Sequence, residues 1–283
     1  MCPVGRKPGS VSKHPRPAGR VIQSARGWSI SVKLENYRQE IVGICTILAF
    51  LVIDGPWTFD ARVRAYILSH PTIIEEANQV LVARQVDELS RQMRPTIQAH
   101  RSSLMADPRD PFVGPRDAKV VVVEFFDYRC SICKVTAAPR VAKLIKAYPD
   151  VKFVFKELPI FGGPSKLAAS TAIAVFQLAP DKYLAVHEAM MAQNALQGTA
   201  TTPAEQATMN AAIASILRAE GLDPVAVSKR AASPEIAGQL NDVKSLATAL
   251  KIDGTPTFIV GDRLIVGANM DEVEKQIAKS VDR

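Results

Sequence analysis

Two cysteines separated by two residues are the feature of this sequence best suited to chemistry. Cys130-Ser131-Ile132-Cys133 follows an apolar, β-branched run and precedes a segment with a helical pattern. Unpaired backbone N–H groups and the helix dipole stabilise an anion at the start of a helix, so a thiol there loses its proton more easily than a free cysteine. We therefore expect Cys130 to be a nucleophilic thiolate.

The second cysteine has a complementary role. Cys133 lies about one helical turn beyond Cys130, close enough to form a disulfide with it or to attack a mixed disulfide. We expect a Cys130–Cys133 redox disulfide in which Cys133 is the buried, resolving thiol. The alternative, half of a zinc site, needs a second pair of ligands. No other cysteine lies after residue 45, and we expect neither a metal nor a cofactor.

The segments around the cysteines predict an α/β fold. Residues 119–128 form a continuous apolar and aromatic run, which is typical of a central strand covered on both faces. A helix over 131–147, interrupted at Pro139, and a strand over 151–158 complete one right-handed βαβ unit.

The rest of the chain predicts a helical block, a hairpin and a last helix. Residues 165–250 are Ala-rich and helical in pattern, with breaks near Pro180, 199–203 and 223–224. Two apolar runs flank Gly261-Asp262, which predicts a hairpin turn, and a helix follows from about Asp271.

Three motifs in this order resemble the DsbA-like branch of the thioredoxin superfamily. They are residues 124–134 (EFFDYRCSICK), 155–159 (FKELP) and 254–261 (GTPTFIVG), with the helical block between the last two. The resemblance implies a thioredoxin-like fold with a helical insertion between the βαβ and ββα halves, over residues 105–283.

The resemblance also implies the remaining site residues. Pro256 is expected to be cis and to face the disulfide, with Thr255 offering backbone hydrogen bonds to an extended substrate; the alternative is an ordinary trans proline. Ser131 and Ile132 are expected to contact the substrate. Glu124 matches a buried acid that relays the proton of the second thiol, and its alternative is a carboxylate in solvent.

The motif departs from the family in ways that bear on its reduction potential. Ser131-Ile132 replaces the usual Pro-Tyr, Pro-His or Gly-Tyr, and Arg129 stands where Asn is frequent. No histidine within the motif stabilises the thiolate, so the resemblance does not by itself imply a strongly oxidising couple. Arg129 and Lys134 are the charges able to compensate. We interpret His187 as a surface or hydrogen-bonded histidine rather than a ligand.

The net charge of +7 is concentrated at the N-terminus. Residues 1–40 contain eight Lys or Arg and two Glu, which leaves the remainder nearly neutral and without a basic, aromatic stripe. This distribution excludes nucleic acid as a partner. Residues 41–53 are uncharged and mostly apolar. By the positive-inside rule, we expect a cytoplasmic tail at 1–40 and export of the chain beyond residue 54.

Residues 41–58 are expected to form an uncleaved inner-membrane anchor, extended by Trp57 and Phe59, that holds a periplasmic domain. The alternatives are a cleaved signal peptide, because an apolar run of this length is typical of one, and a buried core helix. Cys45 is interpreted as a passenger thiol within this segment.

Residues 59–104 predict a helical extension. Thr72 and Glu75 fit a capping box, and Val82, Val86 and Leu89 begin an apolar seam that packs either on the chain's own domain or in a homo-oligomer. Residues 64–76 resemble the extension of ScsC-like periplasmic proteins, which are linked to copper stress and disulfide shuffling. Residues 105–118, with three prolines and a glycine, predict a linker.

These patterns predict a thiol:disulfide oxidoreductase that acts on exported proteins and exchanges electrons with a membrane redox partner. The apolar seam and Thr255 favour isomerase or reductase activity over oxidase activity. Two alternatives from other classes are a copper(I)-handling protein that uses the same two thiols and an interaction module in which the cysteines are idle.

Overall fold

The computed structural model describes residues 34–53, 56–196 and 202–282. Its internal contacts divide the chain into two units, Met1–Pro71 and Thr72–Arg283. Most of the basic tail predicted at 1–40 lies outside the described residues, as do residues 54–55 of the predicted anchor and 197–201 of the helical insertion.

The first unit contains helices α1 (Leu34–Ile53) and α2 (Pro56–Ser69). The apolar side chains of Ile41, Ile44 and Ile47 in α1 are 54%, 57% and 62% exposed within this unit. Across the described parts of the chain, no helix combines the length and the apolar character needed to cross a membrane. The uncleaved anchor expected at 41–58 stays a prediction.

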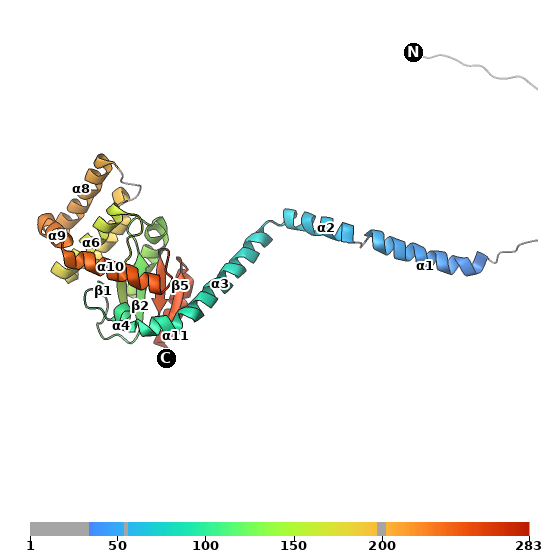
Figure 1. The fold of residues 1–283 in the computed structure, drawn as a ribbon, viewed down its shortest axis with the longest axis horizontal. Helices are drawn as coiled ribbons and strands as arrows, with labels where there is room; N and C mark the ends of the chain where they lie inside the picture. Colours follow the sequence, from blue (N-terminus) through green and yellow to red (C-terminus); the bar gives the residue numbers. More distant parts are fainter. Residues whose placement is uncertain (1–33, 54–55, 197–201, 283) are drawn as a thin grey trace, which may run out of the picture. The chain divides into compact units, whose positions relative to one another are not determined.

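The second unit is built on a five-stranded sheet with the order β1-β3-β2-β4-β5 (Figure 1). Its strands are β1 (Phe112–Val113), β2 (Val121–Phe126), β3 (Lys152–Glu157), β4 (Thr257–Val260) and β5 (Arg263–Val266). Strands β2 and β3 are parallel, whereas β4 is antiparallel to β2 and β5 to β4. This arrangement confirms the predicted thioredoxin-like fold.

Helices surround the sheet, and those between β3 and β4 form the predicted insertion. The helices of this unit are α3 (Thr72–Ala99), α4 (Arg101–Met105), α5 (Ala138–Ala147), α6 (Gly163–Leu178), α7 (Tyr183–Ala192), α8 (Pro203–Ala219), α9 (Pro224–Ala231), α10 (Pro234–Ala249) and α11 (Met270–Val281). A π-helical turn (Cys133–Ala137) precedes α5, and 3-10 turns cover Pro180–Lys182 and Asn194–Leu196. Helices α8, α9 and α10 each begin with a capping oxygen followed by a proline, from Thr202, Asp223 and Ser233.

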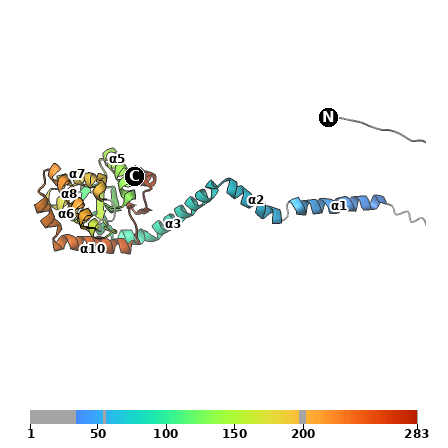
Figure 2. The same ribbon diagram turned by 90° about the horizontal axis from the view of Figure 1, so that it is seen from above.

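The alternation of side chains along β2 separates two hydrophobic clusters. Val122 and Phe126 pack with residues of α5, α6 and α7. Val123 and Phe125 point to the other face and pack with residues of α3, α4 and α10. Figure 2 shows α10 on one side of the sheet and α5 and α7 on the other. Because side chains two apart in a strand share a face, Glu124 lies on the α5 side.

The apolar seam of α3 is shared between the domain and solvent. Met93 and Ile97 are buried in the hydrophobic cluster that contains Val123 and Phe125. The Ser90 hydroxyl accepts a hydrogen bond from the backbone N–H of Leu264 at 3.0 Å. Val82, nearer the start of the helix, is 48% exposed. The C-terminal half of the seam thus packs on the chain's own domain, while self-association of residues 59–104 stays a prediction.

The predicted linker at 105–118 is part of the sheet. Phe112 pairs with Val154 of β3, and the buried Asp110 forms an ion pair with Lys156 of the same strand. Lys156 also donates to the backbone carbonyl of Ser103. These contacts tie the segment to β3, and the boundary expected at 105 falls inside the second unit.

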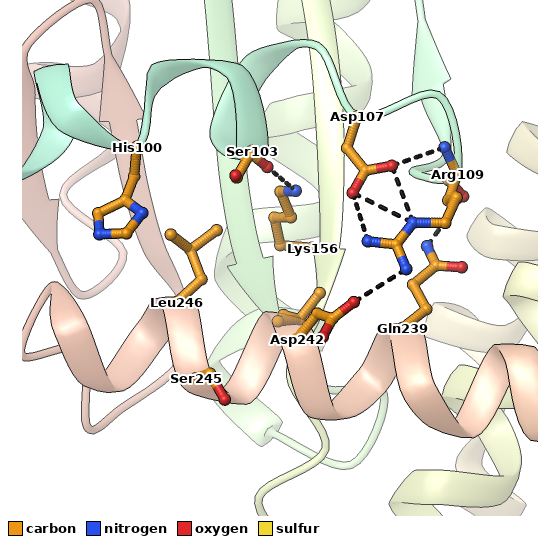
Figure 3. Close-up of a pocket in the computed structure, with 10 residues that line it drawn as sticks. His100, Ser103, Asp107, Arg109, Lys156, Gln239, Asp242, Ser245 and Leu246 are labelled. Atoms are coloured by element: carbon orange, nitrogen blue, oxygen red, sulfur yellow. Dashed lines mark hydrogen bonds and ion pairs between the residues drawn. The ribbon is translucent and has the colours of Figure 1, made fainter.

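A pocket of about 310 Å³ opens between this segment and α10. Figure 3 shows Lys156 reaching Ser103, and Arg109 held between Asp107 and Asp242. The Arg109 guanidinium lies 2.8 Å from the Asp107 carboxylate and 2.9 Å from that of Asp242. None of the predicted site residues lines this pocket.

Replacing Asp110 by Ala should destabilise the second unit, because it leaves the Lys156 ammonium buried without its counter-ion. Loss of one partner of a buried pair costs roughly 3–5 kcal/mol. Chemical denaturation of the full chain measures this change, with the exposed Asp117→Ala in the same segment as control. Equal stability of the two variants contradicts a structural role for the pair.

Candidate functional site

The first cysteine lies where β2 ends and the following helix begins. The backbone N–H of Cys130 donates to the carbonyl of Asp127 at 3.0 Å, and helical structure starts at Ser131. Cys130 is 5% exposed, whereas Cys133 is 0% exposed, and both thiols are free. The predicted placement and the predicted difference in burial are confirmed, while the Cys130–Cys133 disulfide stays a prediction.

A distant segment completes the site. The Cys130 thiol donates to the backbone carbonyl of Thr255 at 3.2 Å, and the Thr255–Pro256 peptide bond is cis, as expected. The alternative of a trans proline is wrong. This contact depends on the sheet, because Thr257, the first residue of β4, pairs with Phe125 near the end of β2.

The environment of Cys130 favours its thiolate. A hydrogen bond from the Cys133 thiol is the main cause that lowers the pKa of Cys130 to about 5, against an opposing contribution from burial. The Thr255 side chain and the backbone N–H groups of Cys133 and Ile132 lower this pKa further. The same hydrogen bond, together with burial, raises the pKa of Cys133 far above that of an ordinary thiol. One sulfur is therefore a nucleophile and the other retains its proton.

Arg129 and Lys134, the two cations expected to stabilise the thiolate in place of a histidine, form hydrogen bonds with other groups. Arg129 donates from Nη1 to the carbonyl of Phe161 at 3.0 Å. Lys134 is buried and donates to the carbonyls of Met190 and Gln193 at 3.1 and 2.9 Å, and burial lowers its pKa to about 8. Hydrogen bonds, not these charges, are the main cause of the low pKa of Cys130.

Glu124 is a buried acid. It is 3% exposed, so the alternative of a carboxylate in solvent is wrong. Burial, and next the negative charge of Cys130, raise the pKa of Glu124 to about 8, so this carboxyl is protonated at neutral pH. The charge of Glu124 is also one of the causes that raise the pKa of Cys133.

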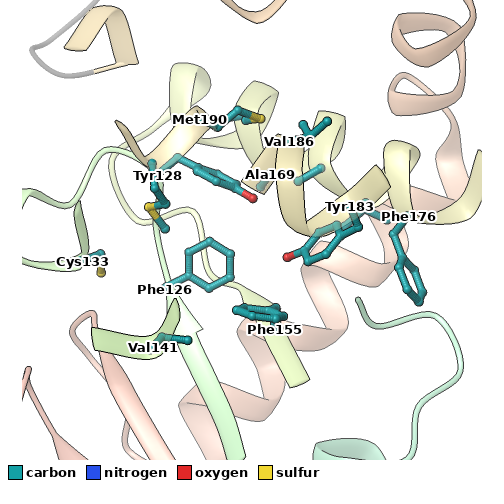
Figure 4. Packing of buried hydrophobic residues seen from close by; sticks show 14 of the residues in the cluster. Phe126, Tyr128, Cys133, Val141, Phe155, Ala169, Phe176, Tyr183, Val186 and Met190 are labelled. Atoms are coloured by element: carbon teal, nitrogen blue, oxygen red, sulfur yellow. The ribbon is translucent and has the colours of Figure 1, made fainter. Parts of the chain in front are cut away.

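The sequence did not reveal a buried polar cluster behind Cys130. The Tyr128 hydroxyl lies 2.9 Å from Nδ1 of His187, and Tyr128 and Tyr183 donate to Oε1 of Glu157 at 3.4 and 3.5 Å. Figure 4 shows the two tyrosine hydroxyls pointing toward a common space. Burial lowers the pKa of His187 to about 3 and raises that of Glu157. His187 is therefore neutral and hydrogen-bonded, in agreement with its interpretation.

Asp127 was also missed, although it is the first polar side chain after β2. It is 2% exposed. Its carboxylate accepts hydrogen bonds from four donors: the backbone N–H groups of Arg129, Ile160 and Phe161 and the hydroxyl of Ser165. No cluster of three or more His, Cys, Asp or Glu side chains able to hold a metal occurs in the part of the chain that the structure describes.

Comparison with known proteins agrees with this geometry. The family described as "DSBA-like thioredoxin domain" matches residues 121–278. The chain is 29% identical to disulfide bond formation protein D of Bacillus subtilis over 175 residues, which are 60% of this chain and 77% of that protein.

Two solved structures share the fold. ScsC of Proteus mirabilis in a transitional conformation is 28% identical with a TM-score of 0.56, and the match covers 80% of this chain and 96% of that one. A periplasmic thioredoxin-like protein from Salmonella enterica serovar Typhimurium is 29% identical with a TM-score of 0.55, over 65% of this chain and 96% of that one.

Alkylation of the reduced chain should follow the titration of Cys130. We expect its rate to rise with pH around a midpoint near 5, since the pKa lies well below the ordinary 9.0. The pKa of Cys130 is lower in the folded chain than in the unfolded chain. The thiolate therefore stabilises the reduced, folded chain fully above pH 9, and this stabilisation is lost as the pH falls through 5. Cys130→Ser removes the reactive thiol, and a midpoint near 9 contradicts the assignment.

Proposed function

Because the chain belongs to the DSBA-like thioredoxin domain family, we propose that it exchanges disulfides with the thiols of other proteins through Cys130 and Cys133. The observation that carries this proposal is the position of Cys130 at the start of a helix and against the cis Thr255–Pro256 segment, where its pKa is lowered to about 5 while Cys133 keeps its proton. A thiolate is the attacking species in disulfide exchange.

The exchange proceeds in two balanced steps. When the pair is reduced, the Cys130 thiolate attacks a substrate disulfide, and a mixed disulfide forms as one substrate thiolate leaves. Cys133 then loses its proton and attacks the Cys130 sulfur, which releases the second substrate thiolate and leaves the Cys130–Cys133 disulfide. In the reverse direction, a substrate dithiol is oxidised and the pair is reduced.

We propose that Glu124 takes the proton of Cys133 when its carboxyl is ionised, a form that becomes more frequent in the mixed disulfide because the Cys130 sulfur then carries no negative charge. It is buried on the face of β2 that carries the cysteine helix, and its pKa of about 8 allows it to change charge near neutral pH. A base with a pKa close to the working pH transfers protons efficiently.

The substrate is proposed to bind as an extended chain beside Pro256. Thr255, which precedes the cis Pro256, contacts Cys130 on one side through its backbone carbonyl. On the other side, Ser131 is exposed and Ile132 is 50% exposed. Both are therefore accessible to a substrate polypeptide that reaches the sulfur.

The low pKa of Cys130 bears on the direction of exchange. A stable thiolate stabilises the reduced pair and makes its disulfide a stronger oxidant. This supports isomerase or oxidase activity, whereas the sequence favoured isomerase or reductase activity. We propose that the substrates are exported proteins, because the similar Salmonella protein is described as periplasmic and a basic tail precedes the apolar residues 41–53. A membrane redox partner is proposed to reset the pair.

Turnover of scrambled and of reduced model proteins tests the function. We expect the purified chain to reshuffle the disulfides of the scrambled protein or to oxidise the reduced one. The Cys130–Cys133 pair should have a reduction potential of about −120 to −180 mV, whereas a value of about −270 mV contradicts an oxidising couple. Cys130→Ser should be inactive. Cys133→Ser should accumulate a mixed disulfide that mass spectrometry detects. Tight copper(I) binding without turnover is the outcome that favours a copper-handling protein instead.

Replacing Glu124 by Gln tests the proton relay. In the wild type, the rate of release of the mixed disulfide should change with an inflection near pH 8, because Glu124 titrates there. The inflection should disappear in Glu124→Gln, while the alkylation midpoint of Cys130 stays near 5. Glu188→Gln, an exposed carboxyl on α7, is the control. An inflection that persists in Glu124→Gln assigns the proton to another group.

A further inference from the structure

A buried tyrosine ties the segment before Cys130 to helix α7. Tyr128, two residues before Cys130 and 1% exposed, places its hydroxyl 2.9 Å from Nδ1 of His187. Figure 4 shows the Tyr128 ring directed toward the helix that carries Val186 and Met190. Because α7 belongs to the helical insertion, this hydrogen bond joins the loop that carries the nucleophile to an element outside the thioredoxin-like strands.

A buried lysine makes a second link, directly after Cys133. Lys134 is 6% exposed and donates from Nζ to the carbonyls of Met190 and Gln193 at 3.1 and 2.9 Å. These carbonyls lie at the C-terminal end of α7, where the helix dipole favours a cation. Since a buried ammonium is costly unless its donors are satisfied, these bonds hold Lys134 against the end of α7.

The two links hold the cysteine motif from both sides. Tyr128 fixes the loop before Cys130, and Lys134 fixes the π-helical turn Cys133–Ala137. The Cys133 thiol donates to Cys130, and a hydrogen bond weakens steeply when its geometry is disturbed. A shift of the loop relative to the turn therefore weakens this bond. Hydrogen bonds dominate the lowering of the pKa of Cys130, so Lys134 acts here through geometry rather than through its charge.

We propose that Tyr128 and Lys134 are positioning residues, which hold Cys130 and Cys133 through α7 at the separation that lets the second thiol donate to the first. This inference rests on the proposed disulfide exchange. It gives a helix of the insertion a part in setting how strongly the pair oxidises its substrates. Neither side chain takes part in the exchange itself.

Single substitutions in the full chain remove each link and keep most of the packing. Tyr128→Phe loses only the hydroxyl, and Lys134→Met loses the ammonium but retains a long apolar side chain. Tyr183→Phe is the control for the first, because it removes a buried hydroxyl of α7 that donates to Glu157 and not to the cysteine segment. Lys143→Met, at an exposed position of α5, is the control for the second.

The readouts are the alkylation midpoint of Cys130 and the reduction potential of the pair. We expect the midpoint to rise by about one pH unit in Tyr128→Phe and in Lys134→Met, which corresponds to the net contribution of a typical hydrogen bond. A rise of this size destabilises the reduced pair about tenfold at neutral pH, so the reduction potential should fall by about 30 mV. Both controls should keep the wild-type midpoint and potential, even where chemical denaturation shows a loss of stability.

Several outcomes overturn the proposal. An unchanged midpoint and potential in both variants leaves the two links with a structural role only. A shift in Lys134→Met alone assigns the effect to the buried charge, and an equal shift in Tyr183→Phe assigns it to a general loosening of α7. If Lys134→Met does not fold, Tyr128→Phe decides by the same two readouts. A wild-type midpoint near 9 rejects the thiolate on which the proposed exchange depends, whereas a midpoint near 5 with unchanged variants rejects only the role of α7.

Discussion

A hydrogen bond between two sulfur atoms organises this site. The Cys133 thiol donates to Cys130 and is the main cause of the low pKa of the first cysteine and of the high pKa of the second. The bond requires one sulfur at the open end of a strand and the other one turn into a helix. The βαβ unit supplies this geometry, and antiparallel pairing of β4 with β2 adds Thr255 as a further partner.

The buried acidic side chains near the cysteines differ in the number of hydrogen bonds that they accept. Burial raises the pKa of Glu124 and of Glu157, which disfavours a negative charge on either side chain. Asp127 is equally buried, but four hydrogen-bond donors converge on its oxygens. Hydrogen bonds to the buried Asp127 carboxylate thus hold the loops around Cys130.

The packing of the sheet extends beyond the thioredoxin-like strands. Helix α3 covers part of one face and satisfies a backbone N–H of β5 through Ser90, which shields a strand at the edge of the sheet. At the other edge, β1 pairs with β3, and the Asp110–Lys156 ion pair is buried beside it. Segments that the sequence assigned to an extension and a linker thus complete the domain.

The sequence alone determined the elements and the chemistry of the central pair. Continuous apolar runs, breaks at prolines, and a Cys-x-x-Cys motif at a strand-to-helix junction are local patterns, and the thioredoxin-like fold, the insertion and the cis Pro256 followed from them or from the family they resemble. Only the tertiary structure decided which polar residues are buried together. Asp110, Asp127, Glu157 and His187 find their partners at sequence separations of more than 25 residues, and the burial that shifts the pKa of Glu124 depends on the whole sheet. Pairs of polar residues that are distant in the sequence leave no periodic or local signal. The hydrophobic pattern of a sequence indicates which side chains are buried, but not which distant polar groups contact one another in the interior.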